Sequence, residues 1–227
     1  MSNLYQNYYR ALGLHIWELR LPDVAASAKR PNPPSPATDL PDWSVLQQTV
    51  TQCTACSLHQ TRTQTVFGTG NPDADLMLIG EAPGFHEDQQ GEPFVGRAGQ
   101  LLTAMIKAMQ MERSEVYIAN ILKCRPPNNR DPLPEEVQTC TPFLDQQIAL
   151  VKPKVLLAVG RIASHYLLNT KASLESLRSK LHYYGEHRTP LIVTYHPAYL
   201  LRNPADKGKA FADLQFTQKT LCNLKKV

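Results

Sequence analysis

Short apolar runs alternate with helical patterns over most of this 227-residue chain. The apolar runs are LMLIG (76–80), VYIAN (116–120), KVLLAVG (154–160) and LIVTY (191–195), and apolar residues recur at helical spacing over 98–109, 135–150 and 161–168. Runs rich in Val and Ile suit buried strands, and strand–helix alternation implies a parallel sheet covered on both faces. The pattern predicts a three-layer α/β/α fold around a central, mainly parallel, four-stranded sheet.

A proline-rich stretch divides the chain near its N-terminus. Pro31, Pro33, Pro34 and Pro36 fix φ and remove backbone donors, so neither a helix nor a sheet runs through them. Residues 22–42 are therefore expected to be a linker. It separates an N-terminal interaction segment, 1–21, from a main domain over 43–227.

Composition excludes some classes of protein and permits others. No apolar run approaches the ~20 residues of a membrane span, and the first residues lack the pattern of a secretory signal. We therefore expect a cytoplasmic protein with reduced thiols. The net charge of +4 and pI near 8.8 permit nucleic-acid binding without establishing it.

Four of the five cysteines form two pairs. Cys53 and Cys56 have C-x2-C spacing, whereas Cys124 and Cys140 are widely separated. Zinc ribbons usually use two C-x2-C knuckles, and iron–sulfur clusters accept scattered cysteines. Spacing alone thus favours a cluster over zinc or unligated thiols without deciding between them. The fifth cysteine, Cys222, is expected to be a buried structural thiol.

Conspicuous polar and glycine residues follow three of the predicted strands. Gly80-Glu81-Ala82-Pro83-Gly84 follows the first, Asn120 ends the second, and His196 follows the fourth. Ligands of parallel sheets bind at the carboxyl ends of strands, so a site is expected there. Taken singly, each residue also has an ordinary interpretation: Asn120 and Glu81 as caps of turns, His196 as a core or surface residue.

Together, these segments resemble the iron–sulfur, or family-4, uracil-DNA glycosylases from about Cys53 to the C-terminal helix. The resemblance implies a 4Fe–4S cluster of structural role on Cys53, Cys56, Cys124 and Cys140. In the N-x3-C-R-P pattern it assigns uracil recognition to Asn120, whose amide complements the N3–H and O4 of uracil. It assigns the catalytic role to His196 of the H-P-A motif.

Further site residues follow from the same resemblance. Phe94, in a G-x-P-F-V-G-x-A-G segment, would stack on the extruded base; on its own it is more typical of a core Phe. Glu81 would orient water or shape the pocket floor, beside the substrate-binding residues Gly80, Ala82, Pro83 and Gly84. Gly84 replaces the aromatic residue that excludes the thymine methyl elsewhere in the superfamily.

Residues 199–202 are expected to contact DNA. The family places its intercalating loop here, and Tyr199, Leu200, Leu201 and Arg202 would supply an apolar wedge and a cation. Unaided, the same residues would be interpreted as the start of a helix.

The N-terminal segment resembles a different protein. Its pattern of apolar and basic residues resembles the N-terminal peptide of the psi subunit of the bacterial replicative clamp loader. The residues that carry the resemblance are Leu14, Ile16, Trp17, Leu19 and Arg20. This implies docking on the clamp-loader collar. The alternative is that the segment docks on its own domain.

The leading hypothesis is a monofunctional glycosylase that excises uracil from DNA and leaves an abasic site. One alternative is a superfamily member that traps the abasic sugar covalently through a His in an Arg-Arg-Ile-His loop. This chain has no His within 125–130. The other alternative is a non-catalytic DNA-binding or replisome-tethering module.

Overall fold

The computed structural model describes residues 42–225, and the predicted N-terminal segment and nearly all of the predicted linker lie outside that range. The elements begin with α2 (Trp43–Thr51), η1 (Ser57–Gln60), β1 (Thr69–Gly70), β2 (Leu76–Gly80), α3 (Phe85–Gln90), α4 (Arg97–Ala108), η2 (Arg113–Glu115), β3 (Tyr117–Asn120) and η3 (Pro127–Asn129). They continue with α5 (Pro134–Val151), β4 (Val155–Val159), α6 (Arg161–Leu167), α7 (Leu174–Leu177), β5 (His182–Tyr184), β6 (Thr189–Thr194), α8 (Pro197–Arg202), η4 (Pro204–Asp206) and α9 (Lys207–Leu224).

The sheet confirms the predicted α/β class and corrects the strand number. It has six strands in the order β1-β3-β2-β4-β6-β5. The four predicted strands form the parallel centre, and their bounds differ from the predicted ones by at most two residues. The short edge strands β1 and β5 are antiparallel additions. Neither was predicted, because runs of two and three half-exposed residues carry no clear apolar alternation.

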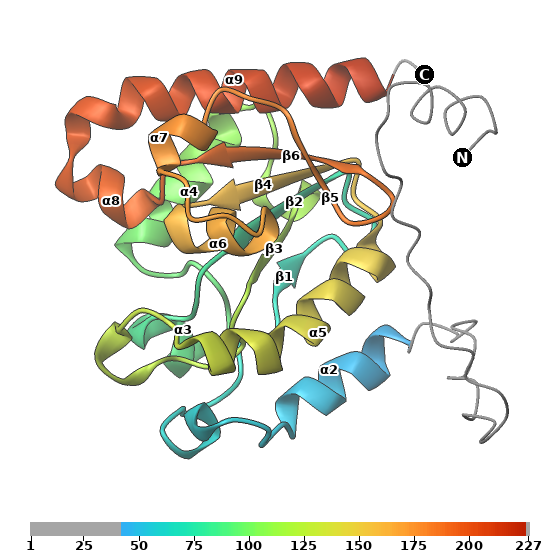
Figure 1. The fold of residues 1–227 in the computed structure, drawn as a ribbon, viewed down its shortest axis with the longest axis vertical. Helices are drawn as coiled ribbons and strands as arrows, with labels where there is room; N and C mark the ends of the chain where they lie inside the picture. The colour runs from blue at the N-terminus through green and yellow to red at the C-terminus, as the bar shows by residue number, and fades with distance from the viewer. Residues whose placement is uncertain (1–41, 226–227) are drawn as a thin grey trace, which may run out of the picture. The chain divides into compact units, whose positions relative to one another are not determined.

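Alternate residues of the central strands point to opposite faces of the sheet. In β2, Met77 and Ile79 join a core with α5 and α6, whereas Leu76 and Leu78 join a second core with α4 and α9. Helices thus cover both faces of the sheet, and α9 runs along one of them (Figure 1). Within residues 42–225, no helix is long and apolar enough to cross a membrane.

Candidate active site

A cleft of about 810 Å³ opens at the carboxyl ends of the central strands, where the strand order predicts a ligand site. Of the predicted residues, Glu81, Ala82, Gly84, Phe94, Asn120, His196, Tyr199 and Arg202 line it. Gly80 and Pro83 belong to the same β2–α3 connection. The fold thus brings together residues that are more than a hundred positions apart in sequence.

Asn120 presents an unpaired acceptor at this cleft. It ends β3 and is 2% exposed, and its Oδ1 has no hydrogen-bond partner. A buried amide oxygen without a partner is costly. Such a group at the edge of a cleft is typical of a site that a ligand donor completes.

Gly80 allows the amide and an aromatic ring to approach the same point. A Cβ on Gly80 would lie 2.4 Å from Oδ1 of Asn120 and 2.6 Å from Cζ of Phe94. Both contacts are far shorter than van der Waals distances, so a side chain at Gly80 would displace one group or the other. The sequence motif identified Gly80 as a site residue. The reason that a glycine is needed there comes from the tertiary structure, which places Asn120 and Phe94 against it.

The Phe94 ring is buried beside the imidazole of His196. The two ring centroids are 5.6 Å apart with planes tilted by 33°. Phe94 has a φ of 55°, which non-glycine residues adopt uncommonly. The first turn of α4 packs directly on its backbone, because a Cβ on Gly99 would lie 1.8 Å from the Phe94 carbonyl oxygen.

Glu87 holds the loop that carries Phe94, and sequence reasoning missed it. Its Oε1 accepts hydrogen bonds from the backbone N–H groups of Val95, at 3.0 Å, and Gly96, at 3.4 Å. A Cβ on Gly84 would come within 2.8 Å of Glu87 Oε2. Gly84 therefore makes room for this carboxylate, a packing role that the sequence did not indicate.

His196 caps α8 and is thereby held in one tautomer. Its Nδ1 accepts a hydrogen bond from the backbone N–H of Ala198 at 3.2 Å, so the neutral ring carries its proton on Nε2. Burial, together with the nearby Arg202 charge, lowers the pKa of His196 to about 4. At neutral pH the ring is an uncharged donor. Gly160 lets it approach β4, since a Cβ there would lie 2.9 Å from the His196 Cβ.

Glu81 is a half-buried carboxyl on the same cleft. Burial, reinforced by the negative charge of Asp131, raises the pKa of Glu81 to about 7, and Arg161 opposes that shift. Asp131 and Arg161 form an ion pair of 2.7 Å and also line the cleft. Sequence reasoning identified neither, because exposed charges carry no periodic signal.

The predicted wedge is helical, and one of its four residues is wrongly assigned. Leu200 is 1% exposed and packs in the core with α4 and α9, so it does not face DNA. Leu201 is 37% exposed and remains a candidate, as does Arg202 on the cleft. Tyr199 stacks on Tyr195 with centroids 5.1 Å apart. The pattern of the family did not distinguish which of two adjacent leucines faces inward.

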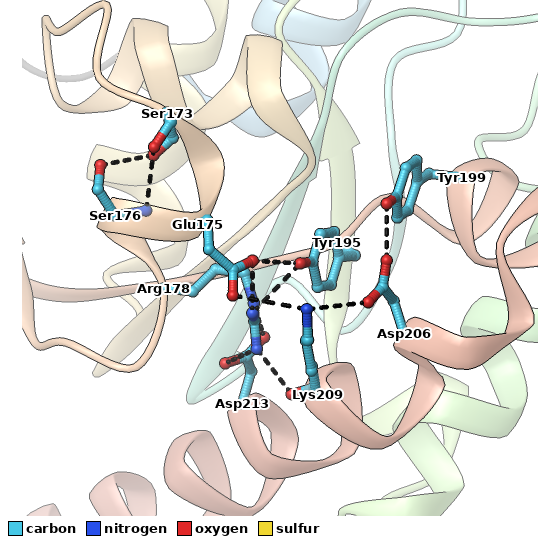
Figure 2. A network of polar contacts seen from close by, with 9 residues as sticks. All are labelled: Ser173, Glu175, Ser176, Arg178, Tyr195, Tyr199, Asp206, Lys209 and Asp213. Atoms are coloured by element: carbon cyan, nitrogen blue, oxygen red, sulfur yellow. Dashed lines mark hydrogen bonds and ion pairs between the residues drawn. The ribbon is translucent and has the colours of Figure 1, made fainter.

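A polar network holds the end of β6 just before His196 (Figure 2). The buried Arg178 donates to both carboxylate oxygens of Asp213, at 2.7 and 3.0 Å, and its guanidinium lies 4.3 Å from the Tyr195 ring centroid. Tyr195 in turn donates to Glu175. The network fixes the backbone that leads into His196 and α8.

The four paired cysteines line one small cavity of their own, together with Arg62 and Lys123. Arg62 Nη1 lies 3.0 Å from Cys124 Sγ, and the backbone N–H of Lys123 donates to Cys140 Sγ at 3.2 Å. In the described part of the chain, no three His, Cys, Asp or Glu residues are arranged to hold a single metal ion. Convergence of four thiols beside N–H donors nevertheless fits a polynuclear centre better than scattered structural cysteines.

Cys222 does not belong to this cavity. It is exposed on α9, so the expected buried structural thiol is wrong. Helical spacing alone did not establish which face of α9 it occupies.

The fold and the cleft define an α/β protein whose cleft is lined by an amide, an aromatic ring and an imidazole. The model of the Uracil DNA glycosylase superfamily matches residues 67–216, and the chain belongs to that superfamily.

Individual relatives indicate which branch of the superfamily the chain resembles more. The chain is 44% identical to a type-4 uracil-DNA glycosylase of Sulfurisphaera tokodaii over 166 residues, 70% of this chain and 76% of that protein. A type-4 uracil-DNA glycosylase of Thermotoga maritima is 44% identical over 165 residues, 72% and 85% of the two chains. A type-5 uracil-DNA glycosylase of Thermus thermophilus is 30% identical over 149 residues, 58% and 68% of the two chains. The greater similarity is to the type-4 branch, as the motifs indicated.

Proposed function

We propose that this protein excises uracil from DNA by hydrolysing the N-glycosidic bond and leaving an abasic site. The observation that carries the proposal is the unpaired Oδ1 of buried Asn120, in a cleft that Phe94 and His196 also line. Uracil presents an N3–H donor and an O4 acceptor, the complement of this amide. Cytosine reverses both and would leave buried groups unpaired.

Each residue then has a definite part in the chemistry. The base is extruded from the stack before the bond breaks, and Phe94 provides a face on which it stacks. As the bond breaks, negative charge develops on the leaving uracil, and the neutral His196 donates to its O2. Ionised Glu81 orients water toward the electron-poor sugar. Among the described residues, no lysine lines the cleft. Since there is then no amine beside the sugar to act as a nucleophile, the site favours a monofunctional enzyme.

A uracil-containing oligonucleotide tests the proposal. Incubation should release free uracil and leave a strand that breaks only after alkali. A covalent protein–DNA adduct would instead support the trapping alternative, and an unchanged oligonucleotide would support a non-catalytic module. A matched oligonucleotide with thymine in place of uracil serves as the control.

Glu81 gives the reaction a specific pH dependence. Its pKa of about 7 lies above the ordinary 4.5, so the ionised form is lost as pH falls through 7. The single-turnover rate should therefore fall about tenfold per pH unit below pH 7 and level off above it. Asp131→Asn should move the midpoint to lower pH and Arg161→Gln to higher pH. A profile that neither variant shifts would contradict the role of Glu81.

We further propose that Cys53, Cys56, Cys124 and Cys140 hold a 4Fe–4S cluster. Cys53 and Cys56 follow α2, Cys124 follows β3 and Cys140 lies in α5, so these four residues would hold the cluster and a bound cluster would supply a cross-link between the three segments. The protein residues contribute thiolates, with Arg62 and the Lys123 backbone donating to two of the sulfurs. Such contacts stabilise ligated thiolates. A cytoplasmic location would keep these thiols reduced until the cluster is assembled.

Substitution of one ligand should remove the whole centre. Cys53→Ser is expected to abolish the broad visible absorption and the bound iron and to lower thermal stability, because the cross-link is lost. Cys222→Ser is the matched control, since its exposed thiol lies outside the cavity, and it should retain the full iron content. Iron-free wild-type protein loaded with zinc and fully active would contradict the cluster.

The clamp-loader hypothesis concerns residues that lie outside the described range. We propose that residues 1–21 tether the enzyme near replicating DNA, with Trp17 as the anchor. Deletion of 1–41 should leave excision from a free oligonucleotide unchanged, since every candidate site residue lies beyond it, and should abolish co-purification with the clamp loader. A deletion that lowers the thermal stability of the remaining domain would instead show that the segment docks on its own domain.

A further inference from the structure

Lys123 is a buried lysine that the proposed chemistry does not use. The residue is 1% exposed; it lines the cysteine cavity and contacts Asn120, which lines the cleft. Its Nζ donates to the backbone oxygen of Asn120 at 2.8 Å and to Oε1 of Gln147 at 2.5 Å. Both acceptors are uncharged oxygens. Burying an ammonium against neutral groups is expensive, so an apolar side chain would be the more stable choice if packing alone mattered.

Helix α5 holds Lys123 at two points. The backbone N–H of Lys123 donates to Cys140 Sγ at 3.2 Å, and its Nζ reaches Gln147 on the same helix. Cys140 and Gln147 are seven residues apart, two helical turns, and therefore lie on one face of α5. Gln147 is itself fixed, because its Nε2 donates to the Phe67 carbonyl oxygen at 2.9 Å and to the Tyr117 hydroxyl at 3.2 Å.

The third partner of this arrangement is the peptide that carries the recognition amide. The Lys123 ammonium donates a hydrogen bond to the backbone carbonyl of Asn120. The side-chain Oδ1 of the same residue has no hydrogen-bond partner among the residues that the structure describes. A fixed carbonyl fixes the peptide plane that follows Asn120 and restricts the directions its side chain can take. Asn120 lies only four residues before Cys124, and Lys123 lies between them. The short segment 120–124 therefore carries the recognition amide, the lysine and one cysteine of the cavity.

We propose that Lys123 is a positioning residue through which the cysteine cavity aligns Asn120 for uracil recognition. The inference rests on the proposed function and extends it: base recognition then depends on the state of the cysteine centre. The cysteines would hold α5 against the 120–124 segment, and Lys123 would pass that restraint to the amide.

Lys123→Met tests this because methionine has a similar length and no donor. The full-length variant should retain its iron, since no ligand changes, but should bind free uracil at least about tenfold more weakly, as measured by product inhibition. Lys154→Met is the matched control: Lys154 pairs with Asp75 on the surface at 3.1 Å, and its loss should leave uracil inhibition unchanged.

A double-mutant cycle separates positioning from general destabilisation. If Lys123 acts through Asn120, then Lys123→Met should slow excision in the wild-type background and cause no further loss in an Asn120→Ala background. A purely structural lysine would lower the rate by the same factor in both backgrounds. Rates are measured under single turnover, well below the unfolding temperature of each variant.

The outcomes distinguish the inference from the function on which it rests. A wild-type protein that releases no uracil overturns the proposed function. An active wild type with unchanged uracil inhibition in Lys123→Met, or with equal losses in both backgrounds, overturns the inference alone. If Lys123→Met does not fold, Gln147→Leu removes the second anchor of the ammonium instead, and the same cycle with Asn120→Ala decides.

Discussion

Replacing His196 with Ala is expected to slow bond cleavage by roughly 10²–10³-fold, the usual cost of losing one preorganised donor to a developing anion. The tautomer is set by the Ala198 N–H on Nδ1, so the lost group is the Nε2–H directed to the leaving base. The effect should appear in the single-turnover rate constant, with little change in DNA affinity, because the interaction strengthens only as charge develops.

His165→Ala is the matched control. His165 lies on α6, bonds to the Ala172 carbonyl oxygen at 2.8 Å and does not line the cleft. Its loss should leave the rate within about threefold of wild type. A similar small change in His196→Ala would contradict the assignment.

The low pKa of His196 adds a second check. Because that pKa is about 4 in the folded protein and 6.5 ordinarily, the ring stays neutral across the neutral range. The contribution of His196 to the rate should be constant from about pH 5 upward. Its contribution to stability should be complete above pH 6.5 and decline as pH falls toward 4, since the unfolded chain takes up the proton first.

Asn120→Asp is expected to reduce uracil excision by at least about 10²-fold, because a site built to hydrogen-bond a base discriminates strongly when a donor is lost. The aspartate offers no N–H to O4 of uracil. Its charge is also buried beside the departing anion, so it opposes the transition state as well as binding. Product inhibition by uracil and the single-turnover rate should both deteriorate.

Asn169→Asp provides the control. Asn169 is an exposed asparagine at the end of α6, outside the cleft lining, and its replacement adds the same charge elsewhere. Its rate should match wild type. An Asn120→Asp enzyme with wild-type rate and uracil inhibition would show that another group recognises the base.

Sequence periodicity was sufficient for the centre of the fold and insufficient at its edges. The four central strands are buried on both faces, so their Val, Ile and Leu content identified them. The edge strands β1 and β5 exist because a neighbouring strand offers them hydrogen bonds. Pairing of this kind leaves no local pattern in such short segments.

The site residues divide in a similar way. Glu81, Asn120 and His196 were identified because they follow strands that end at one edge of the sheet, and the cleft contains all three. Glu87, Asp131 and Arg161 were missed, since their roles come from partners in other loops. Leu200 was assigned to the wrong side of α8, because only the packing of α8 on α4 and α9 determines which leucine is buried.

The sequence by itself determined the α/β class, the superfamily and the identity of the residues that meet at the cleft, because these follow from local periodicity and from motifs at strand ends. Only the tertiary structure decided how those residues act. It placed Asn120 Oδ1 without a partner, set the His196 tautomer, raised the pKa of Glu81 and buried Lys123 in the lining of the cysteine cavity. Burial and long-range hydrogen bonds create these properties, and both depend on residues that are distant in the chain.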